Sequence, residues 1–453
     1  MALEVGIYRT DITPPWGVEL AGLGYYLERS WTRVRDELKA TAIVACQDGR
    51  SVALVAADLM YADAEFTRLV REQVARYTDI PPEAVCVSVS HSHSAPTAGF
   101  ARGVGDQDLE YLALARRQVA TAVICAWRQR RPATLWAGRT TLEGMTFNRT
   151  RQGGEVDSQV SVLRADGADG RPFAAVVNFH AHPTVMMYMD QREVSRDYPG
   201  YVVDTLERSL PGLTAMFVQG SCGDVNFNMD LWEPSRCLEA GRALAGRVLE
   251  ALGRARRMEE EGVGACSLRI QLPTKRYARE EVLRENAEGH YRLKSGDTAG
   301  WRESLGRVMV GQPDRFPERY DGDVGRAVKA LARFAVEWTE EVLPDLDTRP
   351  ETMETEVQAL RFGDLYAAAH GSELFTSFSL DLRRRWPHPD LMVVGYANCS
   401  LSYMPDAHDV ERRSYAAAQS PKFTGHFPFT AASGARLVDG MLAALAQSKG
   451  GGN

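Results

Sequence analysis

Two pairs of histidines stand where predicted strands end. The alternating apolar run VCVSV ends in His91 and His93, and the run FAAVVNF at 173–179 ends in His180 and His182. Because residues i and i+2 of a strand face the same side, we expect each pair to present its imidazoles together. Neutral imidazoles are common zinc ligands, and two pairs would make a bis-histidine site geometrically easy. Local hydrogen bonding without a metal is the alternative for each pair.

Candidate oxygen ligands follow two later strands. Glu373 in AAAHGSELF comes after a predicted strand at 365–369, and Tyr403 lies beyond one at 391–396. The carboxyl ends of strands in α/β proteins are where ligand sites are built, so these side chains are expected to converge with the histidines. Glu373 is the best placed carboxylate, although a helix N-terminus also favours a glutamate without any metal.

A third motif, FVQGSCGDVNFN at 217–228, follows the predicted strand 214–218. Its small residues allow close backbone approach to a ligand, and Asp224 and Asn226 offer an acceptor and an amide for substrate binding. Cys222 would be a nucleophile only with a lowered pKa and a nearby base. We favour a packed thiol in a tight turn.

Alternating strand and helix signals predict an α/β fold of mixed β-sheets layered with helices, in a single domain over residues 1–453. Asp-Gly at 48–49 predicts a hairpin between two β-branched runs. The segment 274–350 is rich in Arg, Glu and Asp and poor in strand signal, so we expect a helical insertion or lid there. Helices are further expected at 64–78, 107–129, 199–209, 234–256, 326–342, 374–385 and 434–447, and additional strands at 85–90 and 264–271 and 357–362.

Composition excludes several classes of partner. The net charge is -7 with acidic and basic residues interspersed, which leaves no basic stripe for nucleic acid. No apolar run approaches the roughly 20 residues that cross a bilayer. The seven cysteines are scattered without CxxC pairs, and the N-terminus does not resemble a signal peptide. We therefore expect a cytoplasmic protein with a small-molecule substrate and no membrane span, and the sequence carries no signal for an oligomeric state.

In chain order, these motifs resemble the catalytic domain of the neutral ceramidases, also called alkaline non-lysosomal ceramidases. The resemblance is spread over most of residues 7 to 420. It rests on seven stretches: YRTDITPPWG, SHSHSAPTAG, FNRT, NFHAHPTVM, QGSCGDVNFN, HGSELFT and YANCSLSYMPDAHDVERRSY.

The resemblance implies a zinc ion and a set of residues around it. In that family zinc is held by two histidines, a glutamate and a tyrosine, and a metal-activated water attacks an N-acyl amide. The matching ligands are His91, His182, Glu373 and Tyr403, with His180 outside the shell. His93, Arg149 and Tyr415 match positions near the scissile bond.

The implied chemistry is consistent with these residue types. Zinc lowers the pKa of water towards about 7 and polarises a carbonyl. Arg149 and Tyr415 could stabilise the developing oxyanion, and His93 is the candidate acid for the leaving amine. Manganese or iron would tolerate the same ligands.

Departures from the family pattern affect the expected substrate. The family has an active-site serine in GDVSPN where this chain has Asn226, and Phe227 replaces the following proline. An amide cannot act as nucleophile or base at neutral pH, so the mechanism must rest on the metal and Asn226 can only hydrogen-bond the substrate. We also expect neither the family's C-terminal β-sandwich nor a secretion signal in this protein. We therefore expect a smaller, more polar substrate than ceramide.

The resulting hypothesis is a zinc-dependent hydrolase that cleaves an amide (N-acyl) or related acyl bond of a soluble substrate. One alternative is a zinc-dependent esterase or lactonase, or a lyase or isomerase, acting on a polar metabolite. Another is a non-catalytic metal-binding pseudoenzyme. The retention of Arg149 and Tyr415 argues against the pseudoenzyme, since function is argued from the site.

Overall fold

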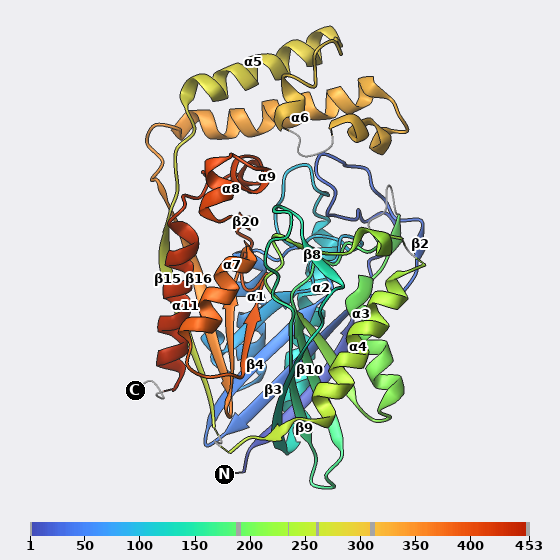
Figure 1. Ribbon diagram of the computed structural model, residues 1–453, viewed down its shortest axis with the longest axis vertical. Helices are drawn as coiled ribbons and strands as arrows, with labels where there is room; N and C mark the ends of the chain where they lie inside the picture. Colours follow the sequence, from blue (N-terminus) through green and yellow to red (C-terminus); the bar gives the residue numbers. More distant parts are fainter. Residues whose placement is uncertain (1, 187–191, 234, 260–261, 309–312, 450–453) are drawn as a thin grey trace.

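The computed structural model describes residues 2–186, 192–233, 235–259, 262–308 and 313–449. Three larger β-sheets lie between layers of helices, with a separate helical pair at one end of the molecule (Figure 1). The predicted α/β class with mixed sheets layered with helices is confirmed.

The first sheet has the strand order β5-β4-β3-β1-β6. Helices α1 and α2 pack together, and α2 covers one face of this sheet. The predicted hairpin joins β3 to β4, because Asp48 and Gly49 both have positive φ, as a tight hairpin turn requires. The elements are β1 (Glu4–Asp11), β3 (Lys39–Gln47), β4 (Arg50–Ala57), α1 (Ala64–Tyr77), β5 (Val85–Val89), α2 (Leu109–Arg128) and β6 (Arg131–Pro132).

The second sheet has the order β12-β10-β9-β7-β14 and is covered by α3 and α4. Strand β10 pairs parallel with β12 and antiparallel with β9. The elements are β7 (Thr134–Thr141), β9 (Gln159–Asp166), β10 (Pro172–Phe179), α3 (Asp197–Ser209), β12 (Thr214–Gln219), α4 (Cys237–Gly253) and β14 (Arg256–Arg257).

The third sheet has the order β15-β16-β17-β19; α11 covers it, and α7 packs against α11. It joins the second sheet through Asn178 of β10, whose amide donates to the carbonyl of Val393 at 3.0 Å and accepts from its N–H at 3.2 Å. The elements are β15 (Val263–Pro273), β16 (Thr352–Phe362), β17 (Leu365–His370), α7 (Thr376–Arg385), β19 (Leu391–Val394) and α11 (Ser433–Lys449).

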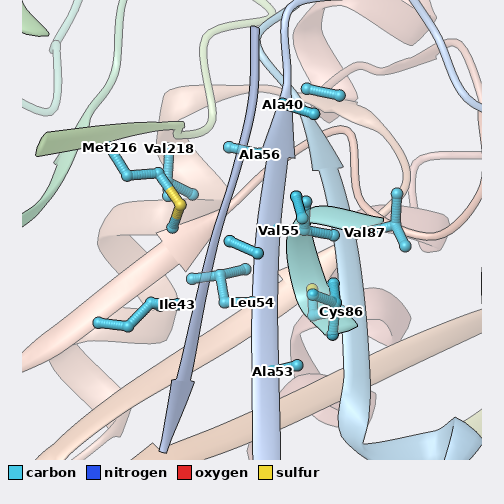
Figure 2. Packing of buried hydrophobic residues seen from close by; sticks show 14 of the residues in the cluster. Ala40, Ile43, Ala53, Leu54, Val55, Ala56, Cys86, Val87, Met216 and Val218 are labelled. Atoms are coloured by element: carbon cyan, nitrogen blue, oxygen red, sulfur yellow. The ribbon is translucent and has the colours of Figure 1, made fainter. Parts of the chain in front are cut away.

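The main core fills the space between the first sheet and the other two. Leu54 and Val55 of β4 lie among buried side chains of β3 and β5 and of β12, including Met216 and Val218 (Figure 2). All five residues of β5 are buried, and four of the five are apolar. This packing fixes the ends of β5, β10 and β17 in one region, from which the loops with the polar motifs emerge.

Short elements hold those loops in place. Two-stranded pairs form between β11 and β2, between β13 and β8, and between β18 and β20. These elements are β2 (Arg33–Val34), β8 (Thr146–Asn148), β11 (Glu193–Val194), β13 (Val225–Phe227), β18 (Glu373–Leu374), β20 (Tyr403–Met404), α8 (Ala407–Glu411), α9 (Tyr415–Ala418) and α10 (Ser420–Thr424).

The segment 274–350 is helical in its described residues, as expected. Helices α5 (Arg279–Ser295) and α6 (Val324–Val342) pack on each other and lie above α8 and α9 in Figure 1. Short 3-10 turns occupy Leu305–Val308, Pro313–Tyr320 and Leu343–Asp345. A hydrophobic cluster joins Phe334 and Trp338 of α6 to Tyr25 and Phe423 of the main body. That the segment 274–350 is an insertion or lid within a single domain remains a prediction.

Candidate metal centre and catalytic site

His91, His93 and His182 are buried and form one cluster beyond the ends of β5 and β10. One potential ligand atom from each lies within 4.8 Å of the others, so this cluster could hold a metal ion. His91 and His93 lie close together, but not because they face the same side of a strand as expected: β5 ends at Val89, and His91 has φ 61°. The loop turns sharply at His91 and returns His93 to the same place.

The three imidazoles share one hydrogen-bonding pattern. A carbonyl can only accept, so each ring must carry a proton on Nδ1, and Nε2 is the nitrogen that remains to bind a ligand. The Nδ1 atoms donate to backbone carbonyls: His91 to Met60 at 3.0 Å, His93 to Gly22 at 2.8 Å and His182 to Cys222 at 2.6 Å.

Glu373 brings a carboxylate to two of these lone pairs. Its Oε2 lies 3.1 Å from Nε2 of His182 and 3.4 Å from Nε2 of His91. Its place follows from the pairing of β18 with β20, which sets Glu373 directly beside Tyr403. Tyr61 donates to the other carboxylate oxygen, Oε1, at 2.6 Å.

The electrostatics of the cluster are compatible with a bound cation. Burial lowers the pKa of His182 to about 3, so its Nε2 carries no proton at neutral pH. Burial also lowers the pKa of His93, and the neighbouring His91 and His182 lower it further. Burial opposes the ionisation of Glu373, but the imidazoles outweigh it and hold its pKa well below the usual range. Where the rings are neutral, their lone pairs would repel this carboxylate, and either a shared proton or a metal ion would remove that repulsion.

Tyr403, Arg149 and Tyr415 lie beside the cluster. The guanidinium of Arg149 donates to the Tyr403 hydroxyl at 2.7 Å and to the carbonyl of Gly223 at 2.8 Å. The Tyr403 ring is parallel to that of His182, with centroids 6.3 Å apart, and Tyr415 packs edge-on against Tyr403 at 5.5 Å. Burial raises the pKa of Tyr403, whereas the Arg149 charge opposes that shift.

The two residues expected to bind substrate differ in their surroundings. Asp224 uses both carboxylate oxygens within the protein: one accepts from the backbone and hydroxyl of Thr376, and the other from Asn148 at 2.7 Å. Asn226 is buried beside His182, with which it forms an isolated bridge, and its Oδ1 has no hydrogen-bond partner among the described residues. Asn226 therefore offers a free acceptor, while Asp224 fixes the start of α7.

The expectation that His180 and His182 pair on one side is wrong. Strand β10 ends at Phe179, and His180 turns away from the cluster of His91, His93 and His182. Its Nδ1 lies 3.1 Å from the backbone N of Ser221, and its Nε2 lies 2.9 Å from Arg383 and 3.6 Å from Asp157. Burial lowers the pKa of His180 to about 4. His180 thus belongs to a buried structural network, which gives it the role that the sequence left open.

Several residues of the site were not predicted from the sequence. Tyr61 orients Glu373, and Tyr396 stacks on His91 with ring centroids 4.1 Å apart. Gly22 accepts from His93 at a φ of 108°, and a Cβ there would lie 2.7 Å from the His93 ring. Tyr61 follows a strand end within ADLMYAD and could have been found by the rule that identified the histidines. Gly22 carries no comparable signal.

Cys222 is a packed thiol, as favoured above. Its side chain is fully buried, and its Sγ lies 3.0 Å from the hydroxyl of Tyr396. Burial raises the pKa of the thiol, so it does not ionise at neutral pH. Its contribution to the site is the backbone carbonyl that orients His182.

A small cavity of about 30 Å³ adjoins the cluster. His93, Tyr403 and Tyr415 line it together with Gly24 and Phe423. This space holds about two water molecules.

Comparison with solved structures shows a similar fold. The neutral ceramidase from Pseudomonas aeruginosa superposes with a TM-score of 0.73 at 18% sequence identity, over 99% of this chain and 75% of that chain. A ceramidase complexed with C2 gives a TM-score of 0.72 at 18% identity, with the same coverage. No protein-family model matches the sequence. No curated protein sequence matches it either.

Within the described residues, the helices are too short or too polar to cross a membrane.

Proposed function

We propose that this protein is a ceramidase-like, zinc-dependent hydrolase that cleaves an amide (N-acyl) or related acyl bond of a small soluble substrate. The observation that carries the proposal is the convergence of the unprotonated Nε2 of His182 and the Nε2 of His91 on Glu373 Oε2, at 3.1 and 3.4 Å. Such a pairing of acceptors is stable around a metal ion. The fold shared with the ceramidases supports the same reading.

The proposed ligands are His91, His182, Glu373 and Tyr403. Zinc bound there would act as a Lewis acid and lower the pKa of water to about 7. The backbone carbonyls behind both histidines fix ring orientation, and Tyr61 fixes the carboxylate. Arg149 beside Tyr403 favours the ionised phenol that a tyrosine ligand requires.

Arg149 and Tyr415 are the proposed stabilisers of the developing oxyanion. The Arg149 guanidinium is held at two points before substrate arrives, by Gly223 and by Tyr403. A donor fixed in advance in a buried site needs no reorganisation during the reaction. Its remaining N–H groups are available to the carbonyl of the scissile bond.

His93 is the proposed proton carrier. Its Nδ1–H is committed to Gly22, and its Nε2 has no hydrogen-bond partner among the described side chains and backbone groups. Because the ring is neutral, it must first take a proton from the attacking water at Nε2 before it can protonate the leaving amine. This order refines the role of acid expected from the sequence.

Asn226 and Asp224 are the proposed substrate-side residues. The free Oδ1 of Asn226 can accept the N–H of an amide substrate. Asp224 helps to position Arg149, because its backbone carbonyl accepts a hydrogen bond from the backbone N–H of Arg149 at 2.8 Å. The replacement of the family's serine by Asn226 also favours a second candidate, an esterase or lactonase (or a lyase or isomerase) built on the same metal centre.

The test is turnover of matched N-acyl amides, esters and lactones by the metal-stripped and zinc-reconstituted protein in ¹⁸O-labelled water. A hydrolase incorporates one solvent oxygen into the carboxylate product, and a lyase or isomerase does not. Arg149→Met should lower kcat/KM by about 10²- to 10³-fold. Arg151→Met is the matched control, because this half-exposed arginine pairs with Asp406. Zinc-independent turnover, or protein that binds no zinc, would refute the proposal.

A further inference from the structure

A second and larger cavity lies at the root of the segment 274–350. Its volume is about 370 Å³, within the range of small-molecule sites. Its walls come from three parts of the chain: residues 275–278 and the first turn of α5, the ends of α8 and α9, and the segment 428–431. The metal cluster and its adjoining cavity contribute none of these walls.

The charged groups at this cavity are unbalanced. Lys275, Arg276 and Arg413 line it with a single carboxylate, Glu281, and that carboxylate pairs with Arg413 at 2.6 Å. Neither Lys275 nor Arg276 forms an ion pair with any residue in the described part of the chain. Two positive charges therefore remain without a partner of opposite sign.

Arg276 is partly buried as well as unpaired. Its Nη2 donates to the carbonyl of Arg349 at 3.0 Å, but its Nε is buried and has no partner among the described groups. The carboxylate of Glu351 accepts from the backbone N–H of Arg276 and not from its guanidinium. A buried N–H without an acceptor costs free energy, which an anionic ligand would recover.

The rest of the wall is largely apolar. Tyr277, Val410, Ala417 and Phe429 line the cavity, which combines this apolar wall with cationic side chains. A ligand that satisfies both features has an anionic head and a short apolar chain. Carboxylates match an arginine fork particularly well.

The cavity also touches the helix that carries a proposed catalytic residue. Helix α9 contributes Ala417 and Ala418 to this cavity, and Tyr415 at its first position to the cavity beside the metal cluster. The salt bridge from Arg413 to Glu281 links the same region to α5. A ligand here would contact both the root of the helical segment and the helix of Tyr415.

We propose that this cavity binds a carboxylate with a short apolar chain and thereby couples the helical segment to the catalytic helix. This is the chemical class released when an N-acyl bond is hydrolysed, so the ligand would act as a product-type effector. That effector role rests on the proposed function, whereas binding to the cavity does not.

The test measures binding of octanoate to the full-length, metal-stripped protein by calorimetry, with octanamide and octylamine as neutral and cationic analogues. Octanoate should bind at least tenfold more tightly than either analogue. Ala418→Phe, which fills the cavity, and Lys275→Glu, which reverses a charge, should each weaken octanoate binding at least tenfold. Lys294→Glu, an exposed lysine of α5, should leave it unchanged.

Equal binding of the three compounds, or octanoate binding in both cavity variants equal to wild type, would overturn the proposal. Thermal melts of Ala418→Phe and Lys275→Glu verify folding, and the two variants perturb the site independently. Metal removal excludes carboxylate binding at the zinc site. With any substrate of the N-acyl, ester and lactone panel that the protein turns over, octanoate should change kcat in wild type but not in Ala418→Phe. Absence of any turnover would refute the hydrolase proposal and leave the binding result intact.

Discussion

Zinc affinity of histidine variants gives the sharpest test of the site. His91 and His93 are two residues apart, both buried, and both donate Nδ1–H to a backbone carbonyl. They differ in their distance from the carboxylate: Nε2 of His91 lies 3.4 Å from Glu373, whereas His93 makes no such contact among the described groups. We therefore expect His91→Ala to lose zinc and His93→Ala to retain it.

The magnitude follows from the size of zinc binding energies. Four-ligand structural sites bind with roughly 10–16 kcal/mol, or about 2.5–4 kcal/mol per ligand. Loss of one ligand therefore corresponds to roughly a 10²- to 10³-fold weaker Kd. His93→Ala removes a neighbour and one hydrogen bond, so its zinc Kd should change by less than about tenfold.

The assay is competition with a chromophoric chelator, started from metal-stripped protein. His290→Ala is the control for the substitution itself, because His290 is exposed on α5 and pairs only with Glu340 among the residues described. Thermal melting without zinc separates metal loss from unfolding. If His93→Ala weakens zinc as much as His91→Ala, the three-histidine cluster is the metal site and the division of roles is refuted.

Three further predictions follow from single contacts. Tyr61→Phe removes the 2.6 Å hydrogen bond to Glu373 and should weaken zinc about 10- to 100-fold in the same chelator assay; an unchanged Kd would contradict the orienting role. Asn226→Ala should raise KM about tenfold for the best substrate. The free energy of unfolding in urea should change by no more than about 1 kcal/mol, because Oδ1 has no partner among the described groups. A lower kcat at unchanged KM would count against a binding role. Asp157→Ala removes the carboxylate that pairs with Arg383 at 2.8 Å and leaves the partly buried guanidinium without its counter-charge. The free energy of unfolding in urea should fall by about 3–5 kcal/mol. Burial opposes the ionisation of Asp157, but His180 and Arg383 lower its pKa, so this stabilisation should be present above about pH 4 and shrink as pH falls through the lowered pKa; a variant equally stable at pH 7 would exclude it.

The fold class and most elements could be predicted from local pattern. The hairpin at Asp48 and Gly49 follows from turn chemistry, and the buried strand β5 follows from hydrophobic spacing. The helical character of 274–350 follows from its charged composition and weak strand signal. Strand β1 was not predicted, because its sequence EVGIYRTD mixes charged and apolar residues. Its pairing with β3 supplies the strand, and no local signal does.

The sequence by itself determined which residue types could form a metal site, because strand ends and histidine spacing are local features. Only the tertiary structure decided which of them meet. His180 and His182 share a strand end, yet one faces Arg383 and the other Glu373. Glu373 and Tyr403 become neighbours through the pairing of β18 with β20, across thirty positions of sequence. The orientation of each imidazole depends on a backbone carbonyl from a distant loop, which side-chain identity cannot specify.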